Sequence, residues 1–193
     1  MSTLLTQLSD ALTHIIASFQ NNWFFALIVL AVLWGVQLLN VISRYKLNIL
    51  GIYPRSLRGL SGIFFAPFLH GNSNHLFFNS VPLYILTILL LSAGRLHFYL
   101  LTALIIFVSG FAVWLFGKKA IHIGASGVIM GYFGYLLTNA YYHPNASTVI
   151  LALLALYYFG GLALALIPSQ EKNVSWSGHV FGFLAGVLGA YLL

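Results

Sequence analysis

Long apolar segments almost free of charged residues are the feature that most restricts how this chain can fold. Only two acidic residues, Asp10 and Glu171, occur in 193 residues, and 61% of the chain is hydrophobic. A helix of about 20 apolar residues crosses the hydrocarbon core of a bilayer. Because a soluble domain of this length cannot bury so much apolar surface, we expect the lipid bilayer to be the solvent of this protein.

Six apolar segments predict an all-α membrane protein, a bundle of six transmembrane helices. Glycine, proline or charged residues mark the short connections between them, such as the turn from Pro168 to Asn173. The predicted spans cover residues 23–42, 75–91, 97–116, 125–142, 146–167 and 177–193. Since no sequence repeat and no linker is evident, residues 23–193 are expected to form one multi-pass integral membrane domain.

The segments before and after the first span predict different structures. In residues 1–22, apolar side chains recur at helical spacing among polar ones, which predicts an amphipathic helix lying on the membrane surface. This segment lacks the basic residues that open a signal peptide. Residues 43–73 hold four basic residues and apolar runs too short to cross, so we expect a loop structure partly sunk in the interface.

The charge balance excludes some classes of function. A net charge of +6 in an integral membrane protein concerns orientation and contact with anionic lipid, so no nucleic-acid partner is expected. The chain has no cysteine, which excludes disulfides, thiolate metal sites and cysteine catalysis. Seven basic residues follow spans one, three and five, and Arg95 alone lies on the other side. The positive-inside rule therefore predicts that the loops after these three spans face the cytoplasm.

A serine and a histidine occupy corresponding places on the fourth and sixth spans. Ser126 stands before Gly127 and Gly131, and His179 lies within the series Gly178, Gly182 and Gly186. Small residues four apart let membrane helices pack backbone to backbone. Because one span separates them, the two helices run parallel, and their polar ends lie at the same depth. We therefore expect the Ser126 hydroxyl and the His179 imidazole to come within hydrogen-bond distance, as a nucleophile and its base.

A third polar motif lies at the start of the second span. His75 and Asn79 are four residues apart and share a helix face, and His70 precedes them by little more than a turn. Polar side chains within a span need partners. Their spacing suits donors that converge on an oxyanion, joined by the backbone N–H of Ser126 at the start of its helix.

Two catalytic arrangements known from membrane enzymes lack their residues in this chain. An aspartyl intramembrane protease needs two acids at membrane depth, and a zinc protease of the His-Glu-x-x-His type needs a glutamate between its ligands. Both acidic residues lie outside the predicted spans. A serine–histidine pair remains, with the histidine oriented by helix packing in place of a carboxylate. Such a pair needs no cofactor and no metal.

Taken together, His70-x4-His75-x3-Asn79, then Gly124-Ala125-Ser126-Gly127, then Gly178-His179-x2-Gly182-x3-Gly186 resembles the rhomboid family of intramembrane serine proteases. The resemblance covers about residues 58–193. It implies that Ser126 is the nucleophile, His179 the general base, and Asn79, His75 and the Ser126 amide the oxyanion site. It gives His70 a more structural role, and it makes Gly124, Gly127 and Gly182 supporting residues.

The chain departs from the family pattern at two places. The Trp-Arg pair common in the first long loop of family members is missing. Met130 stands one turn after the serine, where family members often have an aromatic residue against the catalytic histidine. We interpret Met130 as a change in packing, in which a sulfur–aromatic contact takes the place of that residue.

The resemblance also implies partners and a location. Substrates would be transmembrane segments of other membrane proteins, and the protein would lie in a bacterial inner (cell) membrane in contact with lipid. Bacterial family members usually open the serine end to the exterior, which conflicts with the positive-inside count. Two other hypotheses remain: a catalytically inactive relative that binds transmembrane helices, and a membrane protein with a histidine-ligated haem or metal.

The fifth predicted span contains Gly160 and Gly161 near its middle. Glycine weakens a helix interior, so we expect this to be the least rigid span and a side gate for substrates. A close helix contact at the two glycines is the alternative.

Overall fold

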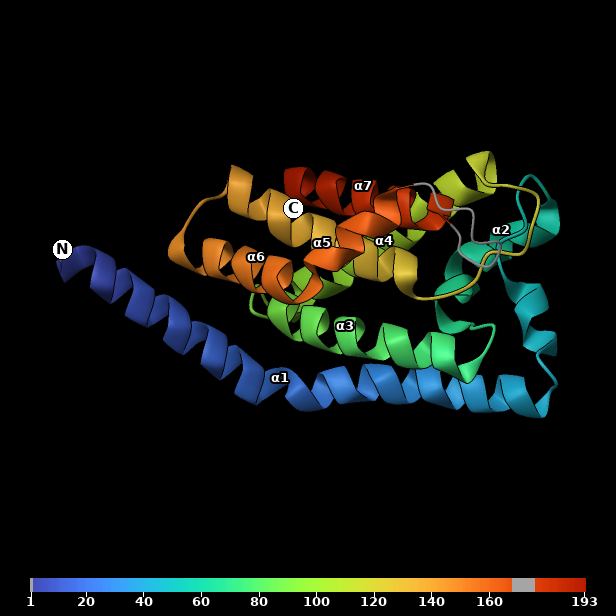
Figure 1. Cartoon of the computed structure of the whole chain (residues 1–193), viewed down its shortest axis with the longest axis horizontal. Coiled ribbons are helices and arrows are strands. Elements are labelled where there is room, and N and C mark those ends of the chain that lie inside the picture. Colours follow the sequence, from blue (N-terminus) through green and yellow to red (C-terminus); the bar gives the residue numbers. More distant parts are fainter. Residues whose placement is uncertain (1, 168–175) are drawn as a thin grey trace.

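The computed structural model describes residues 2–167 and 176–193, and within these residues it is helical apart from connections and one isolated bridge. Figure 1 shows the helices packed as one bundle, with α2 at one end. The elements are α1 Ser2–Ile42, η1 Lys46–Leu50, α2 Leu57–Phe65, η2 Ala66–Phe68, α3 Ser73–Leu91, α4 Arg95–Phe116, α5 Ser126–Tyr142, α6 Ala146–Phe159, η3 Gly160–Leu166 and α7 Trp176–Leu192. The predicted turn from Pro168 to Asn173 lies outside the described residues.

Helix α5 forms the centre of the bundle. Its residues 128–136 are all buried, and it contacts α3, α4, α6 and α7 (Figure 1). A helix that is covered on every side depends on its neighbours for position. The position of Ser126, the first residue of α5, is therefore set by the whole bundle.

Within residues 2–167 and 176–193, four helices are long and apolar enough to cross a membrane, which supports an integral membrane protein. They cover Thr3–Ile42, Ser73–Leu91, Arg95–Phe116 and Ala146–Leu166. The helices α5 and α7 have 17 residues each. At 1.5 Å per residue they are about 26 Å long, slightly less than the thickness of the hydrocarbon core. The prediction of an all-α membrane protein is confirmed, and the count of six spans stays a prediction.

Helix α1 differs from the prediction of a separate helix over residues 1–22. It runs without a break from Ser2 to Ile42. No glycine or proline precedes Gly35, and the Asn22 side chain donates to the Ser18 carbonyl at 2.9 Å, which keeps the turn helical. The N-terminal end of α1 extends past the bundle (Figure 1), whereas Ala11 and Ser18 in the same half of the helix are buried. Its position at the membrane surface stays a prediction.

The segment after α1 is more ordered than the loop expected over residues 43–73. Helix α2 begins at the N-cap Ser56, whose hydroxyl accepts from Gly59 N at 3.1 Å. The indole of Trp114 on α4 donates to the Ser56 carbonyl at 2.9 Å. Ile52 forms an antiparallel bridge with His122, directly before α5. These bonds hold the segment against the end of the bundle that carries Ser126.

The fifth predicted span changes conformation at its glycines. The α-helix ends at Phe159, and the chain continues as the 3₁₀ helix η3. A Cβ atom added at Gly161 would meet nothing within 4 Å, and one added at Gly160 would meet only Leu156 Cδ1 at 3.5 Å, one turn earlier in α6. Within the described residues, the two glycines therefore make no close contact with another helix, and this alternative is wrong.

Candidate active site

Helices α5 and α7 contact each other through their glycines, as the sequence predicted. A Cβ atom added at Gly182 would collide with the carbonyl of Gly127, and one added at Gly186 would collide with the carbonyl of Gly131. A Cβ atom at Gly127 would lie 3.3 Å from the Gly178 carbonyl oxygen. Gly127 thus packs against residues 178–182, the turn of α7 that carries His179.

This contact brings Ser126 and His179 to the same end of the bundle. Ser126 adjoins Gly127 and is half-buried, and so is His179. Within the described residues the two side chains form no hydrogen bond with each other, so the hydrogen bond predicted from the sequence is not seen. Catalytic hydrogen bonds are often long without substrate and shorten when it binds.

The ring of His179 is held by a hydrogen bond at Nδ1. His179 Nδ1 lies 3.3 Å from the carbonyl oxygen of Ala165 in η3. A carbonyl only accepts, so this hydrogen bond requires the proton on Nδ1. Nε2 then carries the free lone pair, and the Ala165 carbonyl bonds to the imidazole at the nitrogen that a carboxylate contacts in a catalytic triad.

His75 lies beside Ser126, across Gly124. A Cβ atom added at Gly124 would be 2.9 Å from His75 Cε1, 3.3 Å from His75 Nε2 and 3.9 Å from Ser126 Oγ. The backbone of Gly124 has φ +119°, in the region that favours glycine. The imidazole and the hydroxyl therefore both border the space that a side chain at residue 124 would occupy.

His70 connects the remaining parts of the site. It is fully buried, and its Nε2 accepts from the Ala125 N–H at 3.3 Å and contacts Asn79 Nδ2 at 3.2 Å. Burial and the neighbouring His75 lower the pKa of His70 to about 4, so the ring is neutral at pH 7 and Nε2 can accept. His70 therefore ties α3 to the residue before Ser126, in keeping with a structural role.

The Asn79 amide, predicted as an oxyanion donor, already contacts another side chain. Its side chain is nearly buried, and its amide nitrogen faces His70 Nε2. An amide has two N–H groups, so one remains for another acceptor. The Ser126 N–H is in the first turn of α5, where N–H groups have no acceptor within the helix. Ala125 at the N-cap contributes no side-chain bond, so these donors stay open to a ligand.

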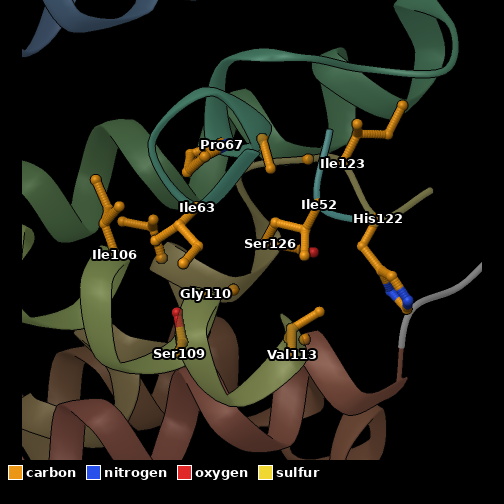
Figure 2. A pocket seen from close by; sticks show the side chains of 15 residues that line it. Ile52, Ile63, Pro67, Ile106, Ser109, Gly110, Val113, His122, Ile123 and Ser126 are labelled. Carbon is orange, nitrogen blue, oxygen red and sulfur yellow. The ribbon is translucent and has the colours of Figure 1, made fainter. Parts of the chain in front are cut away.

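A small pocket of about 50 Å³ opens beside Ser126. Figure 2 shows the serine among side chains from the segment before α2, from α4 and from the chain before α5. Its walls are mostly apolar, and Ser109 and His122 add polar groups. The volume suits one or a few water molecules. Met130 is 1% exposed and does not line this pocket.

Several residues of the site were not among the sequence predictions. Asn40 on α1 is fully buried, and its Nδ2 donates to Asn48 Oδ1 at 2.8 Å and to the His70 carbonyl at 3.3 Å. Asn72 caps α3 by accepting from His75 N at 2.8 Å. An asparagine three residues before His75 is a typical capping pattern, so Asn72 could have been found. The contact of Asn40 depends on the loop path and leaves no local pattern.

The match to a known family agrees with this arrangement. The profile of the rhomboid domain matches residues 57–193, most of the chain and every site residue named above except Asn40, Asn48 and Ile52. This chain belongs to the rhomboid family. Several uncharacterized proteins of mycobacteria are similar to this rhomboid in sequence. Those of Mycobacterium bovis and Mycobacterium tuberculosis are 38% identical over 171 residues, covering 84% of this chain and 71% of each relative. That of Mycobacterium leprae is 36% identical over 172 residues, covering 85% and 68%.

Rhomboid membership and the four long apolar helices show an integral membrane protein. In the part of the rhomboid that the structure describes, no group of three or more His, Cys, Asp or Glu residues is placed to hold a metal ion. The roles of the individual site residues stay predictions.

Replacing Gly124 by alanine should strongly reduce activity. The new Cβ would press on His75 beside Ser126, and φ +119° adds strain of about 1–2 kcal/mol. Gly94→Ala is the matched control, because Gly94 has φ +99° and open space around it at the other end of the bundle. Thermal unfolding should show comparable destabilisation in both variants, and cleavage assays should show a loss in Gly124→Ala alone. Equal activity in the two variants would contradict the placement of His75.

Proposed function

We propose that this rhomboid is an active intramembrane serine endopeptidase that cleaves transmembrane segments of other membrane proteins. The observation that carries the proposal is the glycine contact between α5 and α7, which holds Ser126 and His179 at one end of two adjacent helices. In the proposed reaction, Ser126 Oγ attacks the scissile carbonyl while His179 Nε2 takes the hydroxyl proton. The imidazolium then protonates the leaving amine.

Water completes the reaction. His179 removes a proton from a water molecule, the hydroxide attacks the acyl-enzyme carbonyl, and Ser126 regains its proton as the carboxylic acid leaves. The pocket beside Ser126, with Ser109 and His122 in its walls, supports a supply of water at a depth where lipid would exclude it. The chemistry needs neither a metal nor a cofactor.

The oxyanion of each tetrahedral intermediate would face donors from two elements. The Ser126 N–H and the His75 imidazole are next to the nucleophile, and the second N–H of Asn79 is the third candidate. His70 Nε2 accepts hydrogen bonds from both the Asn79 amide and the Ala125 N–H, which supports a role of His70 in positioning these donors. Preorganised donors of this kind commonly contribute about 10²–10³ in rate each.

The substrate proposal follows from the location of the site. A transmembrane helix hides its peptide carbonyls in internal hydrogen bonds, so residues that weaken the helix near the cut and a small residue before it are expected. We place the enzyme in a bacterial inner membrane, in contact with lipid.

A fluorophosphonate probe tests the proposal directly. The probe should label Ser126 of the detergent-solubilised protein, and His179→Ala should greatly reduce the labelling, because a serine hydroxyl is a weak nucleophile without a base. Mass spectrometry of the labelled peptide identifies the residue. Labelling that persists unchanged in His179→Ala, or that falls on another serine, would contradict the dyad. A folded protein that is never labelled would favour a helix-binding role without proteolysis.

Stiffening the junction of α6 and η3 tests the side gate. Gly160→Ala and Gly161→Ala together should favour a continuous helix by about 1 kcal/mol per residue, and the structure has room for both methyl groups. Cleavage of a transmembrane substrate should slow, if opening limits the rate. Fluorophosphonate labelling is the control, because a small probe does not need the opening: its rate should stay unchanged as long as the Ala165 carbonyl keeps its bond to His179. Unchanged or faster cleavage with intact stability would contradict the gate.

A further inference from the structure

A second cavity lies at the end of the bundle opposite to Ser126. Its volume is about 280 Å³, and it shares no residue with the pocket beside Ser126. The walls come from the C-terminal ends of α3 and α5, the start of α6 and His14 of α1, elements that converge at the end away from α2 (Figure 1). Since α5 has 17 residues, the two ends of that helix are about 25 Å apart. The proposed reaction uses none of these residues.

The lining of this cavity combines apolar walls with several polar side chains and carries no fixed charge. The described residues around it include no Lys, Arg, Asp or Glu. The polar ones are amides, hydroxyls and one imidazole: His14, Ser92, Tyr135, Asn139, Asn145, Ser147 and Thr148. Four leucines and Ala93 complete the walls. Amides and hydroxyls both donate and accept, so the lining matches a ligand that carries hydroxyl groups.

Two groups in the lining need a partner. Tyr135 is 4% exposed, and within the described residues its hydroxyl forms no hydrogen bond, whereas the hydroxyl of the neighbouring Tyr132 bonds to Thr102 Oγ1 at 2.8 Å. The Tyr135 hydroxyl is accessible from the cavity, so it is free to bond to a ligand there. At the start of α6, Asn145 and Thr148 cap each other, which leaves the first-turn N–H of Ser147 open.

The cavity lies between the start of α6 and the ends of α3 and α5. Leu151 and Ala155 are the buried residues of α6, and Leu151 lines the cavity. The outer faces around it are apolar, with Leu12 and Ile16 of α1 and Leu153 of α6 about half exposed. A ligand here would therefore have its polar part among the helix ends and its apolar part in the bilayer.

We propose that this cavity binds the head group of a neutral, hydroxyl-bearing lipid of the acylglycerol or glycosyl-acylglycerol class. Its hydroxyls bond to Tyr135, Asn139 and the start of α6, and its acyl chain follows the leucines toward the membrane. Without a fixed cation, the lining offers a lipid phosphate little compensation for its charge. The volume is just below the usual range of about 300–1,000 Å³ for ligand sites, which restricts the occupant to a small head group.

Photocrosslinking tests this proposal independently of proteolysis. The full chain with Ser126→Ala is incubated in detergent with a monoacylglycerol that carries a diazirine near its head group, and the labelled peptides are mapped. We expect labelling at the end of α3 and the start of α6. Unlabelled monoacylglycerol should compete, whereas lysophosphatidylcholine and lysophosphatidylglycerol of the same chain length should not.

Variants locate the site. Asn139→Leu should lower the labelling about five-fold, the loss expected for one or two net hydrogen bonds. Asn21→Leu is the matched control, since Asn21 is exposed and does not line the cavity, and it should label normally. Ser147→Val replaces Asn139→Leu in the assay if the latter does not fold. The proposal would be overturned by labelling spread around the protein or by equal competition from the phospholipids. Full labelling of both lining variants would overturn it as well.

Discussion

Ser126→Ala should abolish cleavage of a transmembrane substrate, with a fall in kcat of about 10⁴-fold or more, and His179→Ala should do the same. The serine supplies the attacking oxygen and the histidine the base that takes its proton, so either loss disables the same step. The double variant should be little worse than either single variant, because the two residues act as one unit. Cleavage of a fluorogenic transmembrane peptide in proteoliposomes measures all three.

The stability of the variants and the size of the loss in the double variant make this result decisive. Each variant should unfold close to the temperature of the parent protein, because neither side chain takes part in the glycine contact between α5 and α7, and His179→Ala loses only the bond to the Ala165 carbonyl. Losses that add in the double variant would indicate two independent effects and contradict the dyad. Cleavage that survives Ser126→Ala would leave the polar groups as structural links between helices.

Gly186→Ala should have the largest effect on stability. Its Cβ would collide with the carbonyl of Gly131 and lie 2.9 Å from Tyr135 N, and both are backbone atoms of α5. Backbone cannot rotate away as a side chain can, so α5 and α7 must separate along their length. We expect a loss of about 1–3 kcal/mol or more, with most activity lost as well.

Gly35→Ala is the matched control for this prediction. Gly35 also lies inside a helix, but a Cβ atom there would meet nothing within 4 Å. The substitution should leave stability unchanged or raise it by up to about 1 kcal/mol, through helix propensity alone. Tryptophan fluorescence during thermal unfolding in detergent reports tertiary packing. If Gly186→Ala unfolds at the same temperature as Gly35→Ala, the glycine contact between α5 and α7 does not limit the stability of the protein.

The helix contact at the site could be predicted because it depends on local patterns. Glycines four residues apart specify a close approach whatever surrounds them, and two parallel spans then place Ser126 and His179 at equal depth. The direction of the Asn79 amide could not be predicted in this way. His70 reaches Asn79 and Ala125 through a loop whose path is set by η2 and by Asn40, far away in the sequence.

The fold shows the same division between local and distant causes. Helix ends at Gly117 and at residues 143–145 follow from turn formers and glycine, and the structure agrees with them. The glycines at 160 and 161 predicted a weak point inside the fifth span, and there the structure changes from α-helix to 3₁₀ helix. The continuity of α1 was missed because a change in composition near residue 22 does not itself break a helix. The order of residues 43–73 was missed because it comes from bonds to α4 and from the bridge with His122.

The bond between His179 Nδ1 and the Ala165 carbonyl has a consequence for the timing of catalysis. Ala165 belongs to η3, so the element that orients the base is part of the same segment that a lateral opening would displace. An opening there removes the acceptor that keeps the proton on Nδ1, and the imidazole is then free to turn. Arrival of a substrate and activation of the nucleophile would therefore occur in sequence, with peptide hydrolysis waiting until the segment has closed again.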